Sequence, residues 1–399
     1  MFERIVIRQR NSPSLGNPLD LGLLAEALIF YGEVRLIANH VVLENLLCAE
    51  PPEVVLELLE QGFLKLAYET NQLLIMTEND NTPAALHQPT AGHMDAWDLP
   101  VVLRTVLHKV YGRSGKARRV ANRLEKKIEL VQYSENFTNE AAEDLSDEQY
   151  VEESVRTLLR TYVPEYRNSV QFRTIRNGNK LKVLTDVSFP EANRLYHQHI
   201  PATHSSLSPA YFLAHLLNVK ADLQFAARFD SEIAIDDVNA SIIRQHVGQL
   251  FNRLGPSRRA AEAFQEFVFD DARRIAEAVR RGSCRFTDVV AILPKAAKFK
   301  EWLRSDAPQR DVVKAYFREV IAATWIDKLP SKVVRWFVFT GAGIGLDAIG
   351  AGGLGTVAGV GLGVIDSFLL DRLIRGWKPS QFVDDHLRNL IGRDSSGQK

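Results

Sequence analysis

Residues 336–365 read WFVFTGAGIGLDAIGAGGLGTVAGVGLGVI and form the most unusual stretch of the chain. They contain ten of the protein's 24 glycines and one charged residue, Asp347. Small residues recur every four positions, at Ala351, Gly355, Gly359 and Gly363. On a helix this spacing makes a smooth stripe that lets two backbones approach closely, as in membrane helices. The alternative is a helical hairpin packed inside a globular fold.

The length of this stretch argues against a single permanent membrane span. One helix over all of it would be about 45 Å long at ~1.5 Å per residue, and the hydrocarbon core of a bilayer is about 30 Å thick. Two carboxylates, Asp347 and Asp366, would also be costly in hydrocarbon. We therefore expect a glycine-rich helical hairpin over residues 336–378. Its packing or membrane-contacting residues are Gly341, Gly345, Ala351, Gly355, Gly359, Gly363, Asp347 and Asp366.

The remainder of the chain has the composition of an ordinary globular protein. Its 399 residues are 46% hydrophobic and 25% charged, which predicts two or three domains. The 49 basic and 49 acidic residues cancel, so any anion binding must come from a local patch. Cys48 and Cys284 are far apart and belong to no CxxC pair, which indicates a reducing compartment. Because MFERIVIRQR lacks the pattern of a signal peptide, we expect a cytoplasmic protein that associates with a membrane on activation.

Residues 1–80 predict a small α/β module. Residues 2–8 alternate as a half-buried strand does, and Asp20 is placed to cap a helix over LGLLAEALIFY. A strand over 33–38, two helices and a pair of strands in FLKLAYETNQLLIMT follow. This is the order of elements in a winged helix. The helix in the recognition position, PPEVVLELLEQ, carries three glutamates and no basic residue, so we do not expect it to read DNA.

The middle of the chain predicts an α+β region over residues 96–200. It follows a polar, turn-rich linker, ENDNTPAALHQPTAGHMD. Helical patterns run through VVLRTVLHKVYG and through KARRVANRLEKKIEL. Further on, Asn177-Gly178 between two alternating runs is a strong hairpin signal.

From Ser205 the pattern is almost wholly helical. Residues 205–335 predict a helical domain of the bundle type, beginning with a helix at Pro209. The glycine-rich hairpin at 336–378 and a C-terminal helix and tail at 379–399 complete the chain. The expected fold class is α+β and mostly α-helical.

Two charged runs lie next to each other in the middle region. Residues 113–127 hold seven basic side chains and one glutamate, and residues 135–153 hold eight acidic side chains and no basic one. The two runs either neutralise each other or leave a solvated basic face. The other possibility is an anion-binding patch. Its residues are Arg113, Lys116, Arg118, Arg119 and Arg123.

Catalytic and metal-binding signatures are weak by comparison. GRSGKAR at 112–118 fails as a phosphate-binding loop, because Val110 occupies the position of the first glycine and Ala117 that of the hydroxyl residue. In HQHIPATH, the spacing of His197 and His199 points their side chains to different sides of a helix. Nucleophile elbows of the GxSxG type are absent. We therefore assign no catalytic residue, metal or cofactor.

Two passages carry a resemblance to other proteins. They are LDLGLLAEALIFYGEVRLI near the start and LLDRLIRGWKPSQFVDD near the end. Both resemble an uncharacterised family of bacterial cytoplasmic proteins with a C-terminal hairpin similar to a glycine zipper. The resemblance implies one architecture that joins both ends of the chain. It carries no activity that could be transferred.

Three functions are compatible with these patterns. The first is a non-enzymatic bacterial effector, soluble at rest, whose glycine-rich segment perturbs or enters a lipid membrane when triggered, with anti-phage defence as the setting. The second is a scaffold that binds a partner protein or a further copy of itself. The third is a nucleic-acid-binding module using residues 113–127. We rank nucleic acid last, because the neighbouring acidic run offsets the basic charge.

Overall fold

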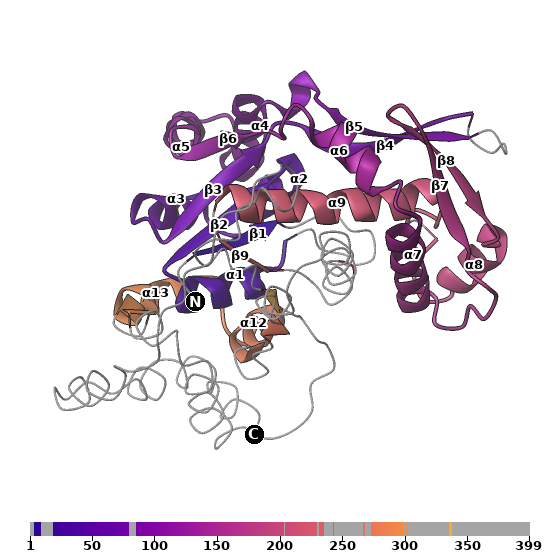
Figure 1. Ribbon diagram of the computed structural model, residues 1–399. Helices are drawn as coiled ribbons and strands as arrows, with labels where there is room; N and C mark the ends of the chain where they lie inside the picture. The colour runs from indigo at the N-terminus through magenta and orange to yellow at the C-terminus, as the bar shows by residue number, and fades with distance from the viewer. Residues whose placement is uncertain are drawn as a thin grey trace, which may run out of the picture.

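The computed structural model describes most of the first three quarters of the chain. The described residues are 4–8, 19–79, 85–202, 204–229, 231–234, 242, 266–267, 273–297, 300–301 and 335–336. Within them the fold is α+β, as predicted, with helices packed on one large and one small sheet (Figure 1). Apart from Arg335–Trp336, the glycine-rich hairpin and the C-terminal tail lie outside the described residues, as do residues 302–334 and most of residues 235–272 of the predicted helical domain.

The strands and helices follow in chain order. The strands are β1 (Arg4–Arg8), β2 (Glu33–Ala38), β3 (Leu64–Glu69), β4 (Gln72–Glu78), β5 (Leu86–Gly92), β6 (Ile128–Val131), β7 (Phe172–Asn177), β8 (Lys180–Thr185), β9 (Glu232–Ala234), β10 (Glu266–Phe267) and β11 (Arg335–Trp336). The helices are α1 (Leu21–Phe30), α2 (His40–Ala49), α3 (Pro52–Glu60), η2 (Asp95–Trp97), α4 (Leu99–Tyr111), α5 (Gly115–Glu125), α6 (Phe137–Asp144), α7 (Glu148–Tyr162), α8 (Phe189–Tyr196), α9 (Pro209–Arg228), α12 (Arg273–Arg280), α13 (Phe286–Ile292) and η3 (Leu293–Ala296).

The large sheet has a parallel centre. Its strand order is β10-β11-β9-β1-β2-β3-β6, in which the five strands from β9 to β6 are parallel. β11 pairs antiparallel with β9, and β10 pairs antiparallel with β11. Parallel strands are covered on both faces, so they favour uninterrupted apolar runs such as the IVI of β1.

The two faces of the large sheet have different coverings. One face packs against helices that include α1 to α5, α12 and α13, and it forms the largest apolar core. The other face carries Val6, Ile37, Ala67 and Val131, which pack with Phe225 of α9. α9 therefore closes the second side of this sheet.

The small sheet is antiparallel, with the order β4-β5-β8-β7. The helices α6, α7 and α9 pack against it. α9 runs through the middle of the molecule, from the helices beneath the small sheet to the large one (Figure 1). Its Leu213 and Leu216 lie in the core beneath the small sheet, whereas Phe225 lies against the large sheet.

Several local predictions are confirmed by hydrogen bonds and backbone angles. The Asp20 side chain caps α1 by accepting a bond from the Leu23 amide at 3.0 Å. β7 and β8 form the predicted hairpin, with Gly178 at φ +64°, a conformation that a side chain disfavours. α9 begins at Pro209, as predicted.

The winged-helix interpretation of residues 1–80 requires correction. The expected elements are present, but β3 and β4 do not pair with each other as a wing would. β3 pairs in parallel with β2 and β6, whereas β4 pairs with β5 in the small sheet. Strand pairing also crosses residue 80, because β1 pairs with β9 and β3 with β6. The strands of residues 1–80 thus belong to sheets that also contain strands from later in the chain.

Three strands lie in stretches for which the sequence predicted a linker or a helix. β5 lies in the predicted linker, β6 in the end of a predicted helix, and β9 in the stretch predicted to be helical after Ser205. All three lack the alternation of a long half-buried strand, and pairing with neighbours stabilises them instead. In β5, Pro89 lies beyond the residues that pair with β8, so its missing N–H does not interrupt that ladder.

α12 packs closely on α1. A Cβ atom added at Gly22 would lie only 2.3 Å from the carbonyl oxygen of Ala276. Beside this contact, Arg280 Nε lies 3.0 Å from Asp20 Oδ2. Asp20 therefore caps α1 and anchors α12 at the same time.

Among the helices of the described residues, none is both long and apolar enough to cross a membrane.

Candidate anion-binding groove

The predicted basic run lies on one arm of a helical hairpin formed by α4 and α5. Gly112 ends α4 with φ +68°, and Ser114 caps α5 by accepting a hydrogen bond from the Ala117 amide at 3.2 Å. Leu103 and Leu107 of α4, with Ala117 of α5, are buried in the largest core. The sequence GRSG at 112–115 is thus a tight helix-to-helix connection.

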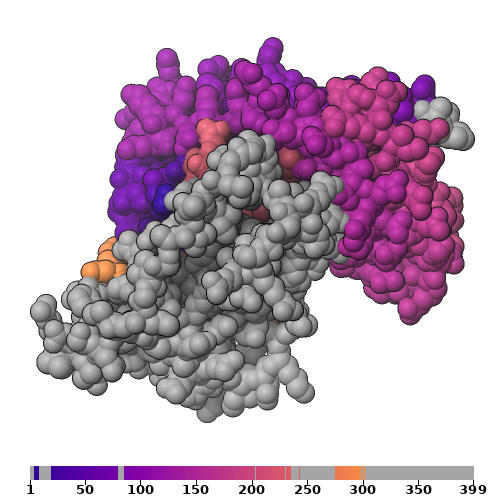
Figure 2. Space-filling model, in the orientation of Figure 1, coloured from indigo at the N-terminus to yellow at the C-terminus, as the bar shows by residue number. Residues whose placement is uncertain are grey.

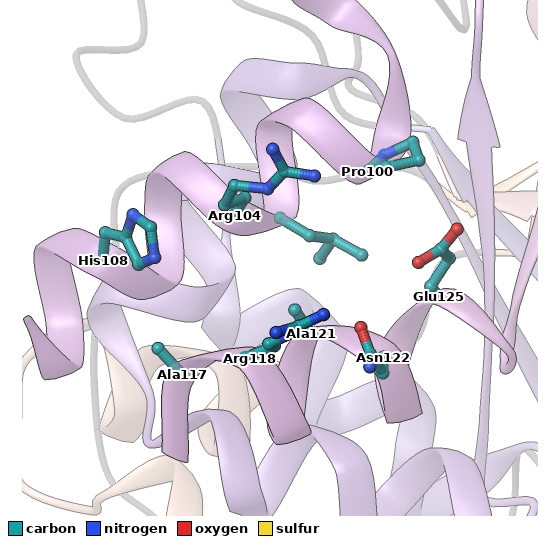
Figure 3. A pocket seen from close by; sticks show the side chains of 9 residues that line it. Pro100, Arg104, His108, Ala117, Arg118, Ala121, Asn122 and Glu125 are labelled. Carbon is teal, nitrogen blue, oxygen red and sulfur yellow. The ribbon is translucent and has the colours of Figure 1, made fainter. Parts of the chain in front are cut away.

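A groove with a cavity volume of about 390 Å³ separates the outer edges of these helices (Figure 3). α4 contributes residues at successive turns, and α5 faces them with a matching row. The lining residues are Pro100, Leu103, Arg104, His108, Ala117, Arg118, Ala121, Asn122 and Glu125. Its volume is within the range of small-ligand sites.

The groove has an apolar floor and a polar rim. Leu103 and Ala117 are buried, whereas Arg104 and Arg118 are exposed. His108 of α4 is half-buried beside them. Such a groove can hold an anionic group between the two guanidinium groups and cover an apolar part of the same ligand.

Two of the five predicted anion-binding residues are occupied by ion pairs with α3. Lys116 Nζ lies 2.5 Å from Glu53 Oε1 and 4.2 Å from the centre of the Tyr111 ring. Arg123 Nη2 lies 2.6 Å from Glu60 Oε1. Glu53 and Glu60, whose negative charge argues against DNA binding by α3, therefore neutralise two of the basic side chains of α5.

The other predicted residues are exposed and have no ion pair within the described part of the chain. These are Arg113, Arg118 and Arg119. Arg104, Lys126 and Lys127 are likewise exposed and without an ion pair in the described part of the chain. Arg104 was not assigned to a site from the sequence. The signal for the α4 row was available: Pro100, Arg104 and His108 recur every four residues and so share one helix face.

The acidic run has other partners. Asp144 Oδ2 lies 2.5 Å from Lys220 Nζ of α9, and Glu152 Oε1 lies 2.6 Å from Arg156 Nη2 within α7. The basic run is thus neutralised by α3 and not by the acidic run. The neutralisation is partial, because only Lys116 and Arg123 are paired with α3. Local charge on the α4–α5 surface is positive even though the whole chain is neutral.

The Glu53–Lys116 pair makes a prediction about pH. Hydrogen bonds from Lys116, and secondarily from Tyr111, lower the pKa of Glu53 from 4.5 to about 2. Because the pKa is depressed on folding, the contribution of the pair to stability is complete above pH 4.5 and is lost as the pH falls through about 2. Titration of the Glu53 carboxyl carbon by NMR should give this low midpoint. In Lys116→Met the midpoint should rise toward 4.5, whereas Arg118→Met should leave it unchanged; equal midpoints in wild type and Lys116→Met would contradict the assignment.

A second polar cluster lies at the carboxyl end of β1, between the large sheet and α9. Arg8 Nε donates to Glu69 Oε1 at 2.6 Å, and its Nη1 donates to Asp222 Oδ1 at 3.1 Å. Nη1 also reaches Asn218 Oδ1 at 3.1 Å, and Nη2 reaches the Tyr133 hydroxyl at 2.9 Å.

This Arg8 cluster is closed to solvent. The side chains of Arg8, Glu69 and Asp222 are 5%, 7% and 1% exposed. Burial alone would lower the pKa of Arg8, but the charge of Glu69 and the hydrogen bonds outweigh it and raise the pKa. The carboxyl ends of parallel strands often bind ligands. Here the position is filled by protein side chains, so we assign the cluster to stability. One indication of this cluster was visible in the sequence. Arg8 and Glu69 directly follow the apolar runs of β1 and β3, and Asp222 interrupts an apolar run in α9.

The histidines of HQHIPATH do not converge. His197 Nε2 lies 3.2 Å from Ser206 Oγ, and His199 Nε2 lies 3.0 Å from Glu165 Oε1. Within the described residues no three potential ligands are grouped as a metal site.

The predicted membrane-contacting or packing residues are Gly341, Gly345, Asp347, Ala351, Gly355, Gly359, Gly363 and Asp366, and all of them lie outside the described residues. Comparison of the chain with protein-family models, curated proteins and solved structures yields no match. The features of the chain that bear on function are therefore the groove and the glycine-rich sequence.

Proposed function

We propose that this protein is a non-enzymatic effector that attaches to anionic membrane surfaces through the α4–α5 groove. The observation that carries this proposal is the set of exposed cations, Arg104 and Arg118 foremost, that have no ion pair in the described structure around an apolar-floored groove. The rest of the proposal, that a membrane is perturbed after attachment, relies on the sequence of residues 336–365.

The electrostatics suit a phosphate-bearing surface. A Lys or Arg close to an anionic bilayer contributes about 1 kcal/mol of attraction at physiological salt. The unpaired cations of this surface are Arg104, Arg113, Arg118, Arg119, Lys126 and Lys127. The ion pairs of Lys116 and Arg123 with α3 hold α5 in place, so Arg118 and Arg119 are presented on a fixed helix.

The shape of the groove favours a lipid headgroup over a bare phosphate. Arg104 of α4 and Arg118 of α5 lie on opposite walls (Figure 3), and Leu103 and Ala121 also line the groove. A headgroup phosphate would contact both guanidinium groups, and the adjoining glycerol and first methylenes would cover the apolar floor. A free anion would leave that floor in water.

The glycine-rich sequence supplies the second part of the proposal. A stretch of thirty residues with one charge and regularly spaced small residues is unusual in a chain that otherwise has globular composition. We propose that residues 336–365 act on the bilayer after the groove has brought the protein to it, in response to a trigger. A bacterial cell under phage attack is the proposed setting, by analogy alone.

Vesicle binding tests the role of the groove. Arg104→Glu/Arg118→Glu should weaken binding to phosphatidylglycerol vesicles by at least about tenfold at moderate salt, because four units of charge change at the contact. Arg160→Glu/Arg194→Glu is the matched control: it changes the same charge at exposed arginines of α7 and α8. It should leave binding within about twofold of wild type. Co-sedimentation against phosphatidylcholine vesicles gives the baseline.

The outcomes separate the proposal from its alternatives. Equal weakening by both variants, or no binding of wild type to anionic vesicles, overturns the groove assignment. Loss of duplex-DNA binding in the groove variant, with vesicle binding unchanged, would place nucleic acid in the groove instead. Deletion of 338–365, which retains β11, should abolish dye leakage from vesicles while binding persists. A scaffold would instead lose its fold or its protein partner on this deletion.

A further inference from the structure

The small sheet has one covered face and one open face. Residues Leu73 and Ile75 of β4 pack toward α6 and α9, and Phe172 and Leu181 of β7 and β8 are buried in the core with α7 and α9. Side chains alternate between the faces of a strand. The intervening residues of β4, β7 and β8 therefore point away from these helices.

Strand register identifies the residues of the open face. Ile175 lies opposite Lys182, and Arg173 lies opposite Leu184, so these four share a face. Lys182 in turn lies opposite Leu86 of β5, which lies opposite Glu78 of β4. Leu74 and Met76 follow on the same face of β4 by alternation.

Large apolar side chains are exposed on this face. Leu74, Met76, Ile175 and Leu184 are 38%, 54%, 49% and 45% exposed. Together they are half of the eight large apolar residues that are exposed in the described part of the chain. Such grouping marks an interaction surface, whereas scattered exposed residues do not.

The charges on the open face are mainly positive. Lys180 Nζ pairs with Glu78 Oε1 at 2.6 Å. Arg173 and Lys182 have no ion pair among the described residues. Three cations and one carboxylate give the face a net charge of +2. Two copies of this face would repel each other, so an anionic partner fits better than a second copy of the chain.

β4 and β5 of the small sheet lie along the upper side of the molecule in Figure 1. α6, α7 and α9 lie below and to the left of the small sheet, so its open face is the one turned away from them (Figure 1). α4 and α5 also lie along the upper side. The space-filling view shows this side formed by the purple and magenta parts of the chain (Figure 2).

We propose that the open face of the small sheet is a second membrane contact, selective for anionic lipid. Leu74, Met76 and Ile175 enter the interfacial region of the bilayer, while Arg173 and Lys182 meet lipid phosphates. This inference rests on the proposed membrane attachment through the groove. It adds an apolar contact to the electrostatic one.

Site-specific labels test this inference. In a Cys48→Ser background, Met76→Cys and Ile175→Cys are each labelled with a polarity-sensitive dye; the remaining Cys284 is buried. Emission from both positions should shift to the blue on addition of phosphatidylglycerol vesicles. The control, Arg194→Cys on α8, is exposed outside the sheet and should not shift. Absence of a shift at 76 and 175, or the same shift at 194, overturns the inference.

A substitution pair gives a second readout. Leu74→Gln/Met76→Gln should weaken vesicle binding by about tenfold, because two apolar side chains lose their burial in the interface. Leu130→Gln/Met94→Gln makes the same chemical change at exposed positions outside the small sheet and should have little effect. Equal weakening by both pairs contradicts a specific sheet contact. If Arg104→Glu/Arg118→Glu weakens binding while the labels do not shift, only this inference fails. If the labels shift while that variant binds normally, the groove assignment fails.

Discussion

Replacing Arg8 by methionine should lower the free energy of unfolding by about 3–5 kcal/mol. The substitution keeps most of the side-chain volume but removes the cation shared by Glu69 and Asp222, which are buried between the large sheet and α9. An uncompensated buried carboxylate is much more costly than a missing surface pair. Urea unfolding followed by circular dichroism measures the change.

The matched control for this prediction is Arg123→Met. Its ion pair with Glu60 is more than one third exposed on both sides, so its loss should cost no more than about 1 kcal/mol. Adding Glu69→Gln to Arg8→Met should recover part of the lost stability, because it neutralises one of the carboxylates left behind. If Arg8→Met and Arg123→Met cost the same, the Arg8 cluster does not hold the sheet and α9 together.

Gly22→Ala should destabilise the protein by about 3 kcal/mol, at the upper end of what overpacking costs. The new Cβ would lie 2.3 Å from a backbone oxygen of α12, and real Cβ contacts essentially never fall below 3.0 Å. A backbone atom cannot move aside as the end of a side chain can, so α12 must shift away from α1. Urea unfolding gives the energy, and hydrogen exchange of the α12 amides reports the detachment.

Gly115→Ala provides the control, because nothing lies within 4 Å of the added atom. Alanine favours the helix by up to about 1 kcal/mol over glycine, so this variant should be as stable as wild type or more stable. A Gly22→Ala protein with unchanged exchange in α12 would show that the two helices do not depend on this close approach.

Local chemistry made much of the fold predictable. The cap at Asp20, the hairpin at Asn177-Gly178 and the helix beginning at Pro209 each depend on residues within a few positions of one another. Strand pairing was harder to predict. β5, β6 and β9 are short and carry weak patterns, and their positions are fixed by partners eight or more residues away. The error in the winged-helix interpretation has the same origin: the order of elements was right, but the partners of β3 and β4 were not visible.

The groove was predictable to a similar extent. The basic run on α5 was visible in the sequence, and Arg118 proved to line the groove. The sequence did not predict the ion pairs of Lys116 with Glu53 and of Arg123 with Glu60. The two glutamates lie some sixty residues earlier in the chain, so only the fold brings the partners together. Arg104 was overlooked because a single arginine on an amphipathic helix gives no signal until the opposite wall is known.

The position of α9 has a consequence for how the molecule responds as a whole. This twenty-residue helix contributes Leu213 to the core under the small sheet and Phe225 to the second face of the large one. Neither half keeps a complete interior without it, so the two should lose their structure in one cooperative step. α9 is also a rigid rod between them. If the small sheet tilts on the proposed membrane contact, α9 would transmit the movement through Asp222 to Arg8 of β1, the strand that pairs with β9.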